Sequence, residues 1–177
     1  MLLIPLKRSL IMMVIFAVIC GVIYPLAALG LAQGTFKYQA NGSITRYGSA
    51  LIGQNFTGSS WFHGRPDPYN PSSSGGSNLG PNSKALYNKT RALIAFYKSR
   101  GITPTQSLVV NSGSGLDPDI SVNAAYAQAA SVARARGLST SQVDQLVKSE
   151  IVGRQFGFLG SPFVNVLALN VALSKTK

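Results

Sequence analysis

The side chains best suited to chemistry are one histidine and a few serines and aspartates in glycine-rich loops. His63 is the only histidine, and with Ser114 and Asp117 it could supply the three members of a hydrolytic triad. A nucleophile elbow has the pattern Gly-x-Ser-x-Gly, whereas Ser112 stands where the first glycine is needed. We therefore expect His63 to serve the Phe-His-Gly-Arg-Pro turn. An extracellular hydrolase is the weakest of the functions considered.

Two short glycine runs could instead bind phosphate or a metal. Residues 113–115 read Gly-Ser-Gly, without the Gly-x-Gly-x-x-Gly spacing or the Gly-Lys-Ser/Thr ending of nucleotide loops. Residues 74–77 read Ser-Gly-Gly-Ser, which matches only part of a transporter-ATPase signature. Asp117 and Asp119 are the only close pair of carboxylates, too few oxygen ligands for a divalent cation. We expect no metal site and no firmly bound cofactor.

Most of these residues lie in loops, which the surrounding elements must position. A long loop over 61–82 is dense in Gly, Pro, Ser and Asn, and its aromatic residues favour an ordered structure. Cap residues and apolar spacing predict helices over 83–100, 121–137 and 139–150 and a strand over 107–111. The segment 49–56 fits a short strand or an ordered approach to one, and the apolar segment 163–173 fits either a helix or a strand. Helices with few strands predict a small α+β domain.

The N-terminal region is typical of a membrane span. The sequence has no charge from residue 9 to 32, and 10–31 is almost wholly apolar, about the 20 residues that cross a hydrocarbon core. Gly21 and Pro25 mark the expected helix as a packing surface for another helix. A signal peptide cleaved after Ala32 remains the alternative.

The charges near this span predict its orientation. Lys7 and Arg8 precede it and favour a cytoplasmic N-terminus. We therefore expect a cytoplasmic segment over 1–8, a transmembrane helix over 9–32 and an extracytoplasmic α+β domain over 33–177, which begins with a polar stalk over 33–46.

The composition of the expected domain limits its partners. Fourteen of the sixteen Lys and Arg residues and all five carboxylates follow the span, which gives this part a formal charge of +9. Membrane lipids, a polyanion or an acidic partner suit that sign, while the scattered basic residues argue against nucleic acid. The only cysteine, Cys20, lies in the span, so the domain must hold by packing without disulfides. The scarcity of carboxylates also suggests an acidic exterior.

Several blocks together resemble the C subunit of the Kdp potassium-transporting P-type ATPase. The similarity covers essentially the whole chain, and after the N-terminal helix its blocks are 48–54, 62–66, 74–81, 112–118, 158–160 and 164–167. The family pattern favours His, Pro, Glu and Arg where this chain has Asp119, Val122, Ser161 and Phe163. These departures concern polar contacts near the last blocks rather than membership.

This resemblance implies a non-catalytic accessory subunit of a prokaryotic cell-membrane complex that imports K⁺. The implied partners are a channel-like potassium-translocating subunit, the P-type ATPase catalytic subunit and a small single-helix subunit. The family's role as a catalytic chaperone implies that ATP is met only through the catalytic subunit, whose ATP binding this chain promotes. A membrane-anchored binding module for anionic surface polymers is the alternative function.

The loops of these blocks contain the candidate functional residues. We expect them to form either the domain's internal scaffold or the contact with the channel-like partner, and the backbone preferences of Gly and Pro favour the scaffold. The candidates are Gln54, His63, Gly64, Arg65, Pro66, Ser74, Gly75, Gly76, Ser77, Asn78, Ser112, Gly113, Ser114, Gly115, Asp117 and Asn165.

Overall fold

The computed structural model describes residues 3–176, so residues 1, 2 and 177 of the expected N-terminal segment and domain lie outside the described residues. The chain divides into two compact units, Met1–Ile44 and Thr45–Lys177. The first is helical, and the second combines helices with small antiparallel sheets, as the expected α+β class requires.

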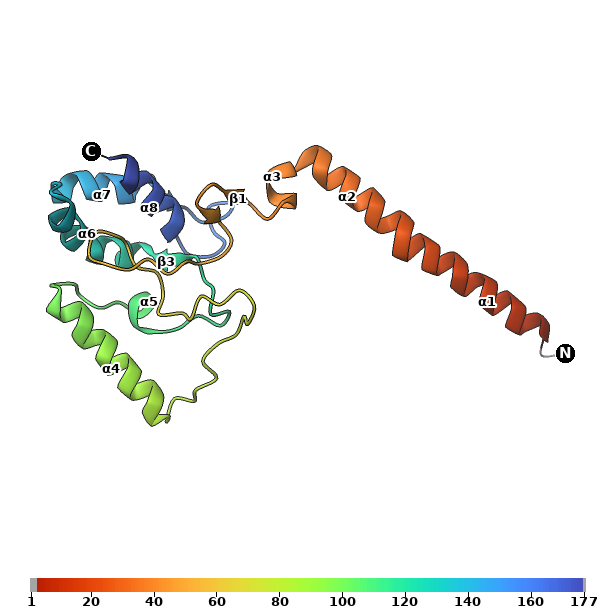
Figure 1. Cartoon of the computed structure of the whole chain (residues 1–177), viewed down its shortest axis with the longest axis horizontal. Helices are drawn as coiled ribbons and strands as arrows, with labels where there is room; N and C mark the ends of the chain where they lie inside the picture. The colour runs from red at the N-terminus through yellow and green to blue at the C-terminus, as the bar shows by residue number, and fades with distance from the viewer. Residues whose placement is uncertain (1–2, 177) are drawn as a thin grey trace. The chain divides into compact units, whose positions relative to one another are not determined.

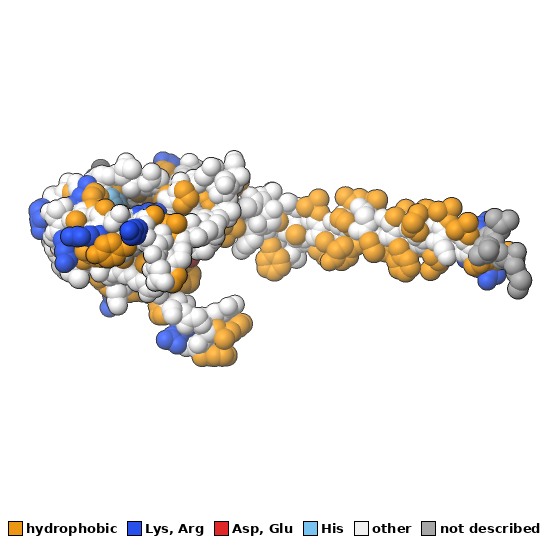
Figure 2. Space-filling model, turned by 90° about the horizontal axis from the view of Figure 1, so that it is seen from below, with side chains coloured by type: hydrophobic (Ala, Val, Ile, Leu, Met, Phe, Trp, Pro, Cys, Tyr) orange, Lys and Arg blue, Asp and Glu red, His pale blue; other side chains and the backbone are white. Residues whose placement is uncertain are grey.

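The first unit is dominated by one continuous apolar helix. It comprises α1 (Leu3–Val18), the π-helical turn η1 (Ile19–Ile23) and α2 (Tyr24–Thr35). Within the described residues, Ile4–Thr35 is the one helix long and apolar enough to cross a membrane. Hydrophobic side chains cover it along its length, and Lys and Arg appear only near its N-terminal end (Figure 2).

The middle of this helix contains a local change of hydrogen bonding. The Tyr24 amide donates to the Ile19 carbonyl, five residues back, as in a π-helix. Pro25 follows directly and has no amide hydrogen to donate, so the irregular turn lies where the regular ladder would be interrupted anyway. Gly21 lies inside this turn with open space around its Cα. Both residues are exposed and therefore available to a neighbouring helix.

The expected polar stalk over 33–46 is wrong in its first part, because the helix continues through Thr35 and a further helical turn, α3 (Lys37–Ala40), follows. The side-chain amides of Gln33 and Asn41 bond to each other in both directions, at 3.0 and 3.3 Å. Thr35 and Asn41 also donate to the helical carbonyls of Leu31 and Lys37, so this segment is ordered helix rather than a loose linker.

The second unit is built around a three-stranded antiparallel sheet of order β3-β5-β4. Its register pairs Ile120 with Val164 and Ile151 with Val164. In Figure 1, α6, α7 and α8 gather on one part of the domain and α4 lies apart, joined through α5. The elements are β1 (Ile44–Thr45), β2 (Gly48–Ser49), α4 (Lys84–Ser99), α5 (Gln106–Val109), β3 (Asp119–Ser121), α6 (Val122–Arg136), α7 (Thr140–Ser149), β4 (Ile151–Val152), β5 (Phe163–Asn165) and α8 (Val166–Lys175).

Three helix starts predicted from the sequence are confirmed. The hydroxyls of Ser83, Ser121 and Ser139 each accept a hydrogen bond from the amide three residues later. Gln142 completes the expected capping box, since its side chain accepts from the Ser139 amide. Gly137 ends α6 with a left-handed backbone, φ +69°.

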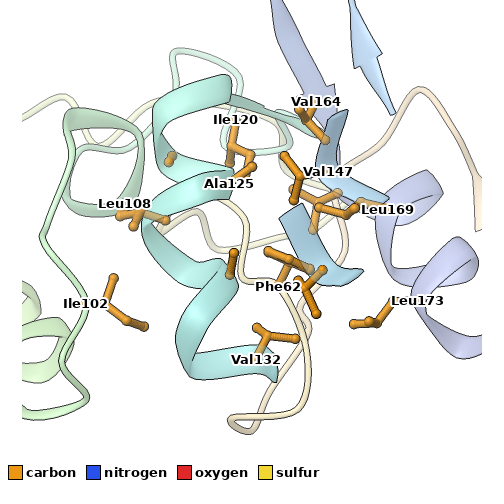
Figure 3. Close-up of a cluster of buried hydrophobic side chains, with 14 of the residues drawn as sticks. Phe62, Ile102, Leu108, Ile120, Ala125, Val132, Val147, Val164, Leu169 and Leu173 are labelled. Carbon is orange, nitrogen blue, oxygen red and sulfur yellow. The ribbon is translucent and has the colours of Figure 1, made fainter. Parts of the chain in front are cut away.

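The core lies between α6, α7, α8 and the loop segment that contains Phe62. Figure 3 shows Phe62 beside Val132, Leu169 and Leu173 within this cluster. Phe62 and Leu173 are fully buried although they come from opposite ends of the domain's sequence. Burial of this kind stabilises by about 1.5–3 kcal/mol for each large side chain.

Two expected strands differ from the structure. At the start of the segment 49–56, only the short strand Gly48–Ser49 forms. The Gly53 amide does not pair with a neighbouring strand, because it donates to the Leu116 carbonyl of a loop. The segment 107–111 forms the helical turn α5 with Ser107 and Leu108 buried. Three apolar residues in a row do not distinguish a strand from a buried turn. The undecided C-terminal segment contains both, β5 and then α8.

Candidate functional site

The backbone of Phe62 and His63 is held by two buried side-chain amides. Asn170 accepts from the Phe62 amide at 2.9 Å and donates to its carbonyl at 2.9 Å. Gln128 does the same for His63, at 2.9 and 3.1 Å. Each amide side chain is only 1% exposed and substitutes for a neighbouring strand, satisfying backbone groups inside the core. The start of the Phe-His-Gly-Arg-Pro run is therefore fixed to α6 and α8.

The His63 ring faces a cleft rather than a nucleophile. Its Nε2 bonds to the Gly58 carbonyl at 2.7 Å, and its ring lies 6.2 Å from the rings of both Phe96 and Tyr97. Burial lowers the pKa of His63, the Gly58 bond opposes that shift, and the charge of Arg100 adds to it. Ser114 and Asp117 bond elsewhere, so these contacts do not assemble the hypothetical triad.

This cleft has a volume of about 380 Å³ and an aromatic floor. Arg100 lies over the Phe96 ring with its guanidinium carbon 4.1 Å from the centroid. Tyr69 and Tyr97 also line the cleft, and burial raises the pKa of both phenols. Both phenols therefore stay neutral at physiological pH, and the ring of Tyr97 packs edge-on against that of Phe96.

Asp67 joins the two expected loops, 62–81 (the first loop) and 112–118 (the second loop). Its carboxylate accepts from the Ser112 amide at 2.8 Å, the Ser112 hydroxyl at 2.6 Å and the Asp117 amide at 3.2 Å. Asn111 approaches the same carboxylate at 3.4 Å and also donates to the Pro66 carbonyl. One carboxylate thus satisfies several donors of the second loop, and bonds to a charged acceptor are stronger than neutral ones.

Backbone bonds continue this junction along both loops. The Ser114 carbonyl accepts from the Gly75 amide at 2.7 Å and the Ser74 hydroxyl at 2.9 Å, and the Tyr69 amide donates to the Gly115 carbonyl. Gly115 has φ +67°, and a Cβ there would lie 2.5 Å from the Gly75 carbonyl oxygen. Only glycine fits both the backbone conformation and this close approach.

Arg65 joins the two loops to each other, and Asn165 connects the neighbouring strands β3 and β5 to the segment before the first loop. Arg65 Nε lies 3.5 Å from Asp117 Oδ2, an ion pair whose side chains are 21% and 32% exposed. Asn165 caps α8 through Ala168 and donates to the Ala50 carbonyl and to Asp119, both at 3.0 Å. Burial raises the pKa of Asp119, while the Asn165 bond lowers it. Asp119, which departs from the family pattern, therefore has a hydrogen-bond partner on the neighbouring strand β5.

The other predicted residues lie around these contacts. The Gly64 backbone passes close to the Tyr69 hydroxyl, Gly76 lies against the Gly113 carbonyl, and Gln54 lines a small cavity with Phe56 and Trp61. Ser77 accepts a long bond from the Leu79 amide, and Asn78 has a left-handed backbone, φ +52°. Val122 packs against the core, and Phe163 lies in β5, where it pairs with Ser121 of β3. Nothing in the structure explains Ser161.

Sequence reasoning missed three residues that join distant segments of the domain, Asp67, Gln128 and Asn170. Asp67 is one of five carboxylates in the chain and stands between two prolines, a detectable signal. Asn170 is the only amide in α8, and Gln128 stands between alanines in the middle of α6; a buried polar side chain at such a position needs a partner.

A single apolar helix followed by a separately packed basic domain defines a membrane-anchored protein with one extramembrane domain. The model of the family described as "KdpC: K+-transporting ATPase, c chain" matches residues 6–175. The chain belongs to this family and is a subunit of a potassium-transporting P-type ATPase complex.

Curated relatives agree over nearly the full length. The potassium-transporting ATPase KdpC subunit of Rhodopseudomonas palustris (strain BisB5) is 45% identical over 193 residues, covering 96% of both chains. The KdpC subunits of Geobacter metallireducens and Gloeobacter violaceus are 46% and 47% identical, covering 96% and 92% of this chain and 96% and 91% of their own. The resemblance drawn from the sequence blocks is therefore confirmed.

Proposed function

We propose that this chain is a non-catalytic accessory subunit that stabilises the assembled potassium import complex. Residues 1–8 lie in the cytoplasm, 9–32 cross the cell membrane once and 33–177 form the domain outside. Lys7 and Arg8 before the span support this orientation. The exposed Gly21 and Pro25 supply a packing surface toward the membrane subunits.

The observation that carries this proposal is that the candidate loop residues bond mainly to one another. The polar side chains at the junction of the two loops bond within it. The Ser112 hydroxyl bonds to Asp67 and to Ser114, and the Ser114 hydroxyl accepts from the Leu116 amide. His63 is held by Gln128 and the Gly58 carbonyl. Side chains that bond to one another in this way hold the loops in one conformation, as a preformed docking surface requires. This supports a scaffold role for the loops rather than a role as a reaction site.

The proposed partners are a channel-like potassium-translocating subunit, the P-type catalytic subunit and a small single-helix subunit. This chain binds no cofactor firmly and promotes ATP binding by the catalytic subunit. Since an outside domain cannot touch cytoplasmic ATP, the effect must come from preferential binding to the ATP-competent conformation of the complex. By linkage, ATP must then tighten the association of this chain by the same factor.

Arg65 and Asp117 offer a test that separates scaffold from partner contact. Arg65→Glu places two carboxylates together where an ion pair now joins the loops at 3.5 Å. Arg65→Glu with Asp117→Arg restores the pair with reversed charges. Arg91→Glu on the exposed part of α4 is the matched surface control.

The measurement is co-purification with the tagged channel-like subunit, followed by the apparent ATP affinity of the complex. We expect Arg65→Glu to reduce both, the double swap to restore both and Arg91→Glu to change neither. If co-purification and ATP affinity are lost in the double variant as well, the charge of Arg65 is needed for contact with a partner subunit. Unchanged ATP affinity in complexes lacking this chain would refute the chaperone role while leaving the assembly role intact.

A further inference from the structure

A rigid hairpin at residues 151–165 carries the most exposed aromatic side chains of the second unit. Beyond β4 and β5 its arms continue through paired bonds between Gln155 and Leu159, whose amides and carbonyls meet at 3.0 and 2.9 Å. The Phe158 amide closes the turn on the Gln155 carbonyl at 3.3 Å. The tip is therefore an ordered turn of the three residues 156–158 between the paired Gln155 and Leu159.

The conformation of this turn is unfavourable for the residue that occupies it. Phe156 has φ +53° and Gly157 φ +83°, the pattern of a type I′ turn, in which Asn or Asp commonly precedes the glycine. A phenylalanine rarely adopts the left-handed region. The strained side chain is nevertheless 79% exposed, and Phe158 is 70% exposed. Phe156 is not part of the hydrophobic core of the described residues or of the side chains packed against it, which points to a function outside the domain.

The segment that forms the tip and its flanks is mostly apolar and contains no carboxylate. From Ile151 to Phe163 the only charged side chain is Arg154. Leu159 and Val152 are also largely exposed, and one side of the hairpin has a shallow hollow of about 450 Å³ lined mainly by apolar surface. Exposed apolar residues gathered with one cation form a surface suited to lipid, where rings enter the acyl boundary and Arg meets phosphate.

We propose that the tip formed by Phe156, Phe158 and Leu159 inserts into the headgroup region of the bilayer that holds the span. Nine residues lie between the end of α2 and the start of the second unit, so even a fully extended chain would separate them by only about 35 Å. This tether makes insertion intramolecular, so a weak apolar contact suffices for high occupancy. The formal charge of +9 beyond the span adds attraction to anionic lipids. The inference is independent of the proposed docking role of the loops.

The test is depth-dependent quenching with the full chain reconstituted in vesicles of phosphatidylethanolamine and phosphatidylglycerol that carry brominated acyl chains. Phe156→Trp reports the tip, and the wild-type chain supplies the signal of Trp61. Tyr87→Trp is the matched control, since Tyr87 is 63% exposed on α4. The same variants are measured with aqueous iodide and in the assembled complex.

We expect the Phe156→Trp signal to shift to the blue, lose most of its intensity to bromine and resist iodide, while the Tyr87→Trp signal responds to iodide. The bromine effect should weaken when phosphatidylglycerol is replaced by phosphatidylcholine. A tip that iodide quenches in both the isolated chain and the complex overturns the proposal. Protection that appears only in the complex, without bromine quenching, also overturns it and identifies a protein contact.

Discussion

Replacement of Asp67 by asparagine tests whether one carboxylate holds the two loops together. Asparagine keeps one oxygen, which can still accept from the Ser112 hydroxyl and the Asp117 amide. Its NH₂ group would then face the Ser112 amide that now donates at 2.8 Å. Losing a bond to a charged acceptor and leaving a half-buried donor unpaired costs about 2–4 kcal/mol in unfolding free energy.

For a domain of this size, that loss corresponds to a fall in Tm of about 6–15 °C. The assay is thermal unfolding of the full chain in detergent, followed by the near-ultraviolet circular dichroism of the domain. Asp117→Asn is the matched control, because asparagine keeps an oxygen that can accept from the Asp119 amide and weakens the partly exposed ion pair to Arg65, which should cost no more than about 1 kcal/mol. A Tm for Asp67→Asn within about 3 °C of wild type would show that the carboxylate does not support the loops.

Three further perturbations test other parts of the domain. Gly115→Ala should lower the unfolding free energy by about 2–4 kcal/mol in urea titrations, because its Cβ meets the Gly75 carbonyl at positive φ, whereas Gly113→Ala, with open space, should change it by less than about 0.5 kcal/mol. His63 has a lowered pKa when folded, so the unfolded chain binds the proton more readily: stability should be full above about pH 6.5 and decline as the pH falls below it, and His63→Gln should flatten that part of the profile. If the stability of the wild-type chain does not change with pH in this range, burial of His63 does not lower its pKa. That result would favour an acidic exterior as the environment of the domain. Phe156→Asn should raise the unfolding free energy by about 0.5–1 kcal/mol because asparagine tolerates the left-handed turn; a loss of stability would show that the phenylalanine supports the fold.

The features predicted correctly from the sequence are those determined by residues close together in the chain. Ser83 and Ser139 cap their helices through amides three residues away, and the span follows from an unbroken apolar run. Such interactions need no knowledge of the tertiary fold. The same local reasoning failed at 107–111, where burial of Leu108 in a helical turn depends on what the fold places around it.

The junctions of the candidate site depend on residues far apart in the sequence. Asp67 meets Ser112 across 45 positions, and Phe62 meets Asn170 across 108. Composition can show that an aspartate or an amide is unusual at its position, but not which backbone groups it satisfies. Glycine patterns located the two loops, and only the fold showed that Asp67 connects them.

The clamp on Phe62 has a consequence for the order in which the domain can be made. Because Asn170 comes 108 positions after Phe62, the backbone amide and carbonyl of Phe62 lack this partner until the chain has been synthesised beyond α8. These two groups of the first loop therefore gain their partner only when α8 packs against them. A ribosome or translocation channel that stops before residue 170 releases a chain in which this part of the core is incomplete.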